Sequence, residues 1–194
     1  MREGVALDLA GAGGHGAIVG GPLSGKSMMR RSIVASLALT HSPLETQFYV
    51  IDCGGATFAP MEPLEHISGV ASGNEEEKVR RTLAEVSGII DSRERFFKEQ
   101  RIDGMDTYRR RRAEGSVDDG FGDVFLIIDG WGVFRSDYEE MEPTVQQIVA
   151  RGLTFGVHVR RSAKRWLEIR ANISDLIGTT LVLGLVAASA SRID

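Results

Sequence analysis

Short apolar runs alternate with longer amphipathic stretches along this chain, and this pattern predicts an α/β fold with a mainly parallel sheet. Over Glu75–Gln100 the apolar residues recur every three or four positions, which predicts one long helix. The same periodicity predicts helices over Lys26–Thr40 and Glu142–Gly152. The run Asp123–Ile128, DVFLII, is short and apolar, as expected of a strand that is covered on both faces of a sheet.

Further strands are predicted where β-forming residues cluster. They lie at Ala17–Val19, at Gln47–Ile51 just before Asp52, and at Leu176–Leu185. Val157 and Val159 begin another strand, but Arg160 and Arg161 interrupt its apolar pattern. Because two arginines are costly to bury, we expect either an edge strand or arginines that reach a cleft or a neighbouring domain.

Two stretches are predicted as loops, because glycine, proline and small residues favour turns. They are Cys53–Asn74 and Gly115–Gly122. The basic run Tyr108–Arg112, YRRRR, lies between them and indicates a solvated helix face rather than a binding patch.

A glycine-rich segment after the first strand carries the clearest chemistry. It matches the spacing G-x-x-x-x-G-K-S with Gly20, Gly21, Pro22, Leu23, Ser24, Gly25, Lys26 and Ser27. Glycines let backbone N–H groups turn inward onto phosphate oxygens, and the following helix points its positive end at the same anion. We therefore predict a P-loop in which Lys26 reaches the β- and γ-phosphates and Ser27 ligates Mg²⁺. The alternative is an ordinary glycine-rich turn with a solvated lysine.

A P-loop enzyme also needs an acidic residue at the end of a neighbouring apolar strand. Asp129, after VFLII, is the predicted residue, and Asp52 is the competitor, better explained as a loop residue near the site. Many such ATPases place a glutamate next, where it activates the attacking water, but this chain has Gly130. We therefore expect ATP binding with slow or absent hydrolysis, unless a base comes from elsewhere, such as Glu139 or Glu140.

Composition limits the possible partners, compartment and metal sites of the protein only modestly. The chain has 194 residues, enough for one domain with a full core, and its net charge of −4 argues weakly against nucleic acid as the main partner. Cys53 is the single cysteine, which excludes an internal disulfide and favours a reducing, cytoplasmic compartment. The four histidines are scattered and suggest no metal site. No apolar run is long enough to span a bilayer, and the N-terminus does not look like a signal peptide.

Several segments occur in an order that resembles one known family. They are GGPLSGKS, FYVIDCGG, GVASGNEEEKVRRTLAEV, VFLIIDGW, GVHV and RW-x-EIR. This series is similar to the FtsK/SpoIIIE-type ATPase domains of EccC proteins, which drive type VII (ESX) secretion, and the similarity runs from about Gly4 to Asp194. EccC proteins carry such domains in tandem, and IDGW resembles the degenerate acidic motif of the later ones, the second or third. The resemblance thus implies that residues 1–194 form one domain of a longer protein.

The resemblance implies an ATP-binding module of a secretion motor, with ATP and Mg²⁺ as cofactors. Lys26 and Ser27 match the P-loop pair, Asp129 matches the metal-site aspartate, and Ser162 matches a sensor-like residue that faces the γ-phosphate. Implied partners are other ATPase domains of the motor and small helical Esx proteins, with the membrane reached only through other segments or subunits. The implied location is the cytoplasm, at the inner face of the membrane.

Departures from the family pattern leave some alternatives open. Arg160 and Arg161 replace apolar residues, and Val186–Ala188 stands where a Gly-Asp-Pro turn is expected. A DNA translocase of the same superfamily is the alternative function, which Gly130 and the acidic charge balance disfavour. No lid or acceptor motif supports a metabolic kinase. Sequence alone does not identify an arginine that acts in trans.

Overall fold

The structure is a computed structural model that describes residues 14–165, 168–169 and 177–183. The described strands form one sheet in which every recorded pairing is parallel, in the order β3-β2-β4-β5-β1-β6. The strands are β1 His15–Gly20, β2 Thr46–Asp52, β3 Ile67–Ser72, β4 Asp123–Asp129, β5 Val157–Ala163 and β6 Ile177–Leu183. The predicted α/β class with a mainly parallel sheet is confirmed.

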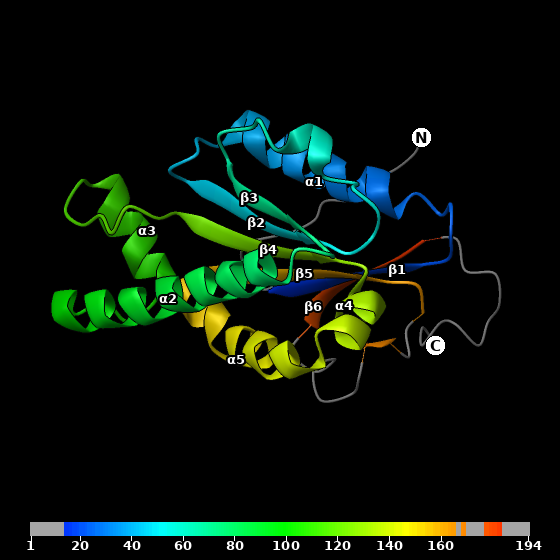
Figure 1. The fold of residues 1–194 in the computed structure, drawn as a ribbon. Helices are drawn as coiled ribbons and strands as arrows, with labels where there is room; N and C mark the ends of the chain where they lie inside the picture. The colour runs from blue at the N-terminus through cyan, green and yellow to red at the C-terminus, as the bar shows by residue number, and fades with distance from the viewer. Residues whose placement is uncertain (1–13, 166–167, 170–176, 184–194) are drawn as a thin grey trace.

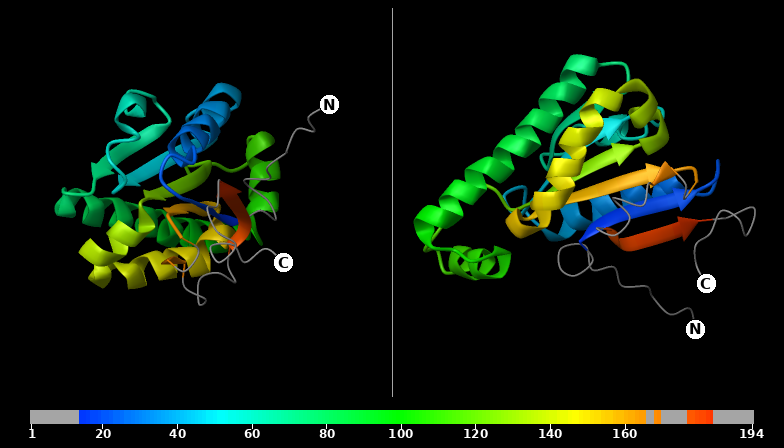
Figure 2. Two further views of the ribbon diagram at one scale, coloured as in Figure 1. Left: turned by 90° about the vertical axis from the view of Figure 1, so that its right-hand side faces the viewer. Right: turned by 90° about the horizontal axis from the view of Figure 1, so that it is seen from below.

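Helices cover both faces of the sheet (Figure 1). They are α1 Lys26–Thr40, α2 Glu76–Gln100, α3 Met105–Ala113, α4 Trp131–Asp137 and α5 Glu142–Gly152, with single 3₁₀ turns η1 Ala59–Met61, η2 Glu139–Met141 and η3 Leu153–Phe155. Helix α1 lies over one face, and α2, α4 and α5 lie over the other (Figures 1 and 2). None of the helices in the described residues has the length and apolar character of a membrane-crossing segment.

Strict alternation along the central strands builds a core on each side of the sheet. On β4, Val124, Leu126 and Ile128 belong to the cluster under α2 and α5, whereas Phe125 and Ile127 belong to the cluster under α1. All five side chains are buried. Because both faces are covered, the strand has to be apolar throughout, as its sequence predicted.

The predicted loop Cys53–Asn74 is wrong in part, because it contains the strand β3 and the turn η1. Strand β3, sequence ISGVAS, pairs only with β2 in the described sheet. Its centre holds Ser68 and Gly69, so the run has too few β-forming side chains to predict a strand. Backbone pairing with the strongly β-forming β2 supplies what its own sequence lacks.

Of the two alternatives predicted for the arginine-bearing strand, the edge position is excluded, because β5 lies between β4 and β1. Alternation sends its two arginines to opposite faces. Arg161 is buried with its guanidinium 4.8 Å from the centre of the Trp131 ring, and Arg160 lies 5.6 Å from the centre of the Phe125 ring. Each stacks on an aromatic face, whereas the Arg161 nitrogens Nε, Nη1 and Nη2 are buried without a hydrogen-bond partner in the described part of the chain.

The basic run Tyr108–Arg112 is only partly the solvated face that its sequence predicted. It lies in α3, where the Tyr108 ring is buried. Arg109 pairs with Asp123 at 2.7 Å, and Arg112 pairs with Asp118 at 3.3 Å. These pairs fix α3 to the loop before β4. The altered turn Val186–Ala188 lies outside the described residues.

Candidate active site

The glycine-rich loop connects β1 to α1 and has the backbone that a phosphate cradle needs. Gly25 precedes the first residue of α1 with φ 91°, in the left-handed region that favours glycine. Leu23 also has a positive φ, of 58°, and its side chain is fully exposed. A Cβ on Gly20 would lie 2.4 Å from the backbone carbonyl oxygen of Leu183 on β6, so only glycine fits there. The N-terminus of α1 therefore opens onto the loop, where it favours a bound anion.

Lys26, the first residue of α1, directs its ammonium group onto the loop. Its Nζ donates to the carbonyl oxygens of Gly20 at 2.6 Å and Gly21 at 2.5 Å, and to Ser24 Oγ at 3.3 Å. Burial and the nearby charge of Arg30 lower the pKa of Lys26 from its usual value. The cation thus lies where phosphate oxygens would replace backbone carbonyls as its acceptors.

Asp129 ends β4, and Ser162 lies beside it near the end of β5. The strand order puts β5 between the P-loop strand and β4, and Ser162 pairs in register with Ile18 of β1. Ser162 Oγ donates to Asp129 Oδ1 at 2.5 Å and accepts from the Gly130 amide at 2.9 Å. The structure therefore brings Asp129 and Ser162 together, and the serine hydroxyl orients the carboxylate.

Arg30 is the residue at this site that the sequence analysis missed. Its guanidinium pairs with both carboxylate oxygens of Asp129, Nη1 to Oδ1 at 2.5 Å and Nη2 to Oδ2 at 2.8 Å. Nη2 also donates to Ser27 Oγ at 3.2 Å. The side chain is buried, and burial lowers the pKa of Arg30, a shift that the Asp129 and Asp52 carboxylates oppose. A signal was available, because Arg30 is three residues after Ser27 and four after Lys26 and so shares their helix face.

The predicted magnesium ligands, Ser27 and Asp129, do not fit Mg²⁺ in this arrangement. Mg²⁺ needs oxygen ligands at about 2.0–2.1 Å in a near-octahedral shell. Here a guanidinium cation binds both carboxylate oxygens of Asp129 and donates to the Ser27 hydroxyl. The described residues contain no group of three or more His, Cys, Asp or Glu side chains suited to a metal ion. This geometry departs from the site that the sequence predicted.

Asp52, the competing acidic residue, is explained by the loop that follows it. Its carboxylate accepts from the Gly54 amide at 3.1 Å and from the Phe58 amide at 2.9 Å. These bonds shape the turn after β2, and Gly54 packs against the Asp129 carboxylate. Asp52 is therefore a loop-forming residue near the site, as predicted.

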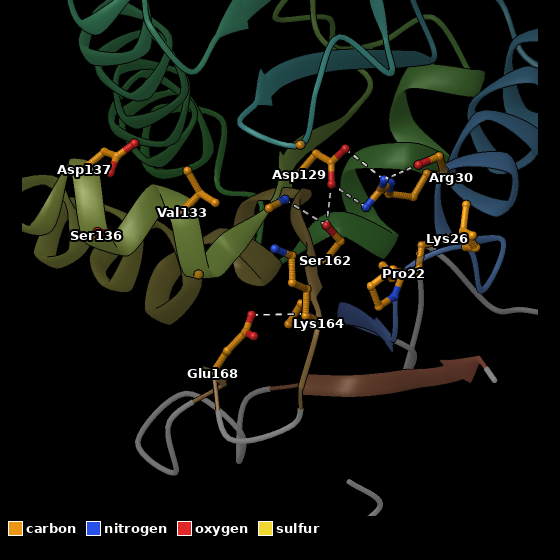
Figure 3. Close-up of a pocket in the computed structure, with 16 residues that line it drawn as sticks. Pro22, Lys26, Arg30, Asp129, Val133, Ser136, Asp137, Ser162, Lys164 and Glu168 are labelled. Carbon is orange, nitrogen blue, oxygen red and sulfur yellow. Dashed lines mark hydrogen bonds and ion pairs between the residues drawn. The ribbon is translucent and has the colours of Figure 1, made fainter. Parts of the chain in front are cut away.

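An open cleft of about 710 Å³ lies between the P-loop, the end of β4 and the start of α4, and its lining includes Lys26, Ser27, Arg30, Asp129 and Ser162 (Figure 3). Pro22, Lys26 and Arg30 border one side, and Val133, Ser136 and Asp137 of α4 border the other (Figure 3). Lys164 and Glu168 close a third side, where Glu168 Oε2 accepts from the Lys164 amide at 3.1 Å. The cleft has the size of a small-molecule site.

The acidic side chains that line this cleft differ from those proposed from sequence as alternative bases. Asp137 and Glu168 line it together with Asp129, whereas Glu139 and Glu140 do not. The expected position of a water-activating glutamate is Gly130, which adopts φ 76°. The cleft thus combines a glycine-rich loop and a helix N-terminus with no carboxylate directly after Asp129.

The FtsK/SpoIIIE family model matches residues 1–194. The chain belongs to the FtsK/SpoIIIE family. Within it, the chain is 48% identical over 189 residues to the ESX secretion system protein EccC of Thermomonospora curvata, covering 97% of this chain and 14% of that protein. It is 42% identical over 191 residues to the ESX-1 secretion system protein EccCb1 of Mycobacterium tuberculosis, covering 97% of this chain and 32% of that protein.

Solved structures place this FtsK/SpoIIIE domain among the EccC ATPase domains of ESX systems. A structure of Thermomonospora curvata EccC, ATPases 2 and 3 in complex with a signal sequence peptide, matches 91% of this chain and 32% of that chain, with 49% identity and a TM-score of 0.88. The cytoplasmic domain of EssC matches 91% of this chain and 34% of that chain, with 19% identity and a TM-score of 0.82, and supports the fold alone. The chain therefore spans about a seventh to a third of the length of its curated EccC relatives.

Proposed function

We propose that this domain binds ATP as a module of a type VII secretion motor and turns it over slowly or not at all. The proposed nucleotide site is the loop 20–27 with Asp129 and Ser162. The observation that carries this proposal is Lys26 beside the helix N-terminus, in a cleft where Gly130 follows the strand-ending aspartate. Charge-assisted contacts from a lysine and backbone amides suit a triphosphate, whereas a glycine offers no base to activate water.

Retained ATP would act as a structural ligand. A ligand that binds only the folded, assembled state stabilises that state by mass action, without turnover. The proposed partners are neighbouring ATPase domains of the same motor and exported Esx-type helical proteins, and the proposed location is the cytoplasmic face of the membrane. A relative's structure in complex with a signal sequence peptide supports testing a labelled signal-sequence peptide for binding.

Calorimetry of ATP binding tests the central claim. Lys26→Ala removes the ammonium group from the cradle, so we expect ATP binding to fall below detection while the thermal melting curve stays cooperative. Lys98→Ala, on the exposed end of α2, is the matched control and should bind ATP as the parent does. Undiminished binding by Lys26→Ala would contradict the proposed site.

A single-turnover assay separates slow hydrolysis from motor-like hydrolysis. We expect a rate below about 1 s⁻¹, the lower end of typical enzyme turnover. Asp137→Asn and Glu168→Gln report whether either carboxylate in the cleft contributes to whatever rate remains. A faster parent rate would contradict this part of the proposal.

The DNA translocase alternative predicts salt-dependent DNA binding, which fluorescence anisotropy measures. The net charge of −4 and Gly130 both disfavour it. Strong DNA binding that weakens steeply with added salt would favour the translocase over the secretion module.

A further inference from the structure

Arg30 lies between the two groups that would otherwise ligate the metal of a metal–nucleotide complex. Its guanidinium contacts the Ser27 hydroxyl and both carboxylate oxygens of Asp129, and its side chain is 6% exposed. Figure 3 shows Arg30 and Lys26 on the same side of the cleft, with the guanidinium directed at Asp129. One cation thus already neutralises the carboxylate that P-loop enzymes use for Mg²⁺.

The remaining bonds around Asp129 hold this arrangement in place. Oδ1 also accepts the Ser162 hydroxyl, and Gly54 packs against the carboxylate without space for a Cβ. The carboxylate therefore has little freedom to rotate away from Arg30 toward an ion. A divalent ion between Ser27 and Asp129 would also lie against a guanidinium, and the two like charges would repel at short range in a partly dehydrated site.

The guanidinium also has hydrogen-bonding capacity left over. Arg30 Nε is buried and has no hydrogen-bond partner in the described part of the chain. A buried donor without an acceptor is unfavourable. Guanidinium groups bind phosphate oxygens through charge-assisted hydrogen bonds. Arg30 and Lys26 line one cleft and together suit a polyphosphate.

We propose that Arg30 takes the place of the divalent cation, so that this site binds free ATP and does not require Mg²⁺. This inference rests on the proposed ATP-binding function and deepens it. Without a divalent ion at the β- and γ-phosphates, the site also lacks the Lewis acid that phosphoryl transfer uses. Arg30 and Gly130 are then two separate reasons for slow hydrolysis, one at each side of Asp129.

Calorimetry of the unmodified domain tests whether its binding of ATP depends on Mg²⁺. ATP is titrated once in EDTA and once in excess Mg²⁺, and we expect binding in EDTA to be at least as tight as binding in Mg²⁺. A dissociation constant at least about tenfold lower in Mg²⁺ would overturn this inference while leaving ATP binding intact. No binding in either buffer would overturn the proposed function, and this inference with it.

Arg30→Ala frees Asp129 and Ser27, so we expect this variant to gain magnesium dependence, with ATP binding at least about tenfold tighter in Mg²⁺ than in EDTA. Arg31→Ala is the matched control, because Arg31 is the adjacent arginine on the same helix and does not line the cleft. It should remain indifferent to Mg²⁺. If Arg30→Ala folds and shows no gain, Arg30 does not replace the ion, and the proposal fails.

A metal readout that needs no turnover completes the test. Electron paramagnetic resonance records the spectrum of Mn²⁺ mixed with a non-hydrolysable ATP analogue and excess protein. The parent should leave the Mn²⁺ signal free of a protein-bound component, whereas Arg30→Ala should acquire one. A protein-bound Mn²⁺ signal in the parent would contradict the proposal, even if Arg30→Ala proves too unstable to study.

Discussion

Gly130 follows the aspartate of β4 with φ 76° and ψ 53°, in the left-handed region that side chains disfavour. A Cβ there would lie 3.0 Å from the carbonyl carbon of Cys53 and 3.1 Å from its oxygen. The backbone, and not only the residue type, therefore opposes a glutamate at this position. Restoring the usual acid requires the turn between β4 and α4 to move.

For Gly130→Glu we accordingly expect no gain in single-turnover rate and a loss of about 1–3 kcal/mol in unfolding free energy, measured by urea denaturation. Gly88→Ala is the control. Gly88 is an exposed residue inside α2 with open space at its Cβ, so alanine should raise stability by about 0.5–1 kcal/mol. A Gly130→Glu protein that hydrolyses ATP at motor-like rates would show that residue identity alone limits the parent.

At the scale of elements, Arg93 holds α2 to the loop before β4. Its fully buried guanidinium donates to Asp119 Oδ2 at 2.7 Å and to the carbonyl oxygens of Phe121 at 2.8 Å, Gly122 at 3.1 Å and Phe155 at 2.8 Å. The helix, the loop Gly115–Gly122 and η3 thus meet at one side chain. Loop carbonyls that could not pair with each other are satisfied by its fork of donors.

Arg93→Met keeps an unbranched but shorter side chain and removes the guanidinium that pairs with Asp119 and donates to the carbonyls of Gly122 and Phe155. Breaking a buried pair by removing one partner typically costs about 3–5 kcal/mol, so we expect a loss of that size in unfolding free energy. Arg95→Met, on the exposed side of the same helix, should change stability by less than about 0.5 kcal/mol. Urea denaturation measures the unfolding free energy of both variants. Equal losses in Arg93→Met and Arg95→Met would contradict a structural role for Arg93.

The elements that the sequence predicted well are those whose own periodicity decides them. Helix α1 spans Lys26–Thr40 and α5 spans Glu142–Gly152, as predicted, because length and apolar spacing agree locally. Strand β3 and the course of β5 depend on neighbours in the sheet, which the local pattern does not contain. The short helix α4 begins at Trp131 between two glycines, Gly130 and Gly132, which mask it.

The candidate site likewise contains residues that local sequence predicts and a residue whose role depends on a distant part of the chain. The loop 20–27 is predicted from motif spacing, because phosphate binding dictates residue types at fixed offsets, and Asp129 is predicted from its place at the end of an apolar strand. Arg30 escaped prediction because its role depends on Asp129, which is 99 residues away in the sequence. Helix periodicity places it on the face of Lys26 and Ser27, but only the strand order brings Asp129 to that face.

At the scale of the whole molecule, His15 joins three elements. It lies buried on β1, where Nε2 donates to the Val149 carbonyl of α5 at 2.7 Å and Nδ1 accepts from the Val159 amide of β5 at 2.9 Å. A carbonyl can only accept and an amide can only donate, so the ring is neutral with its proton on Nε2. Burial, followed by positive neighbours such as Arg160 and Arg161, lowers the pKa of His15 to about 4.

A depressed histidine pKa makes folding weaker in acid. In the unfolded chain His15 takes up a proton near its ordinary pKa of about 6.5, whereas in the folded protein it does so only near 4. The contribution of neutral His15 to the unfolding free energy is therefore fully present above about pH 6.5. It is lost as the pH falls toward 4, at up to about 1.4 kcal/mol per pH unit. Protonating Nδ1 would set its proton against the Val159 N–H and separate β1 from β5, the two strands that carry the P-loop and Ser162.

His15→Gln removes the titrating group from this junction. We expect a lower unfolding free energy at pH 7, because a polar contact is lost, but a shallower decline between pH 6.5 and 4.5 than in the parent. Urea denaturation at a series of pH values measures both. His41→Gln, at an exposed site after α1, should keep the parent slope. Parallel curves for the parent and His15→Gln would show that other groups govern the acid response, because the difference between these two proteins isolates the buried ring.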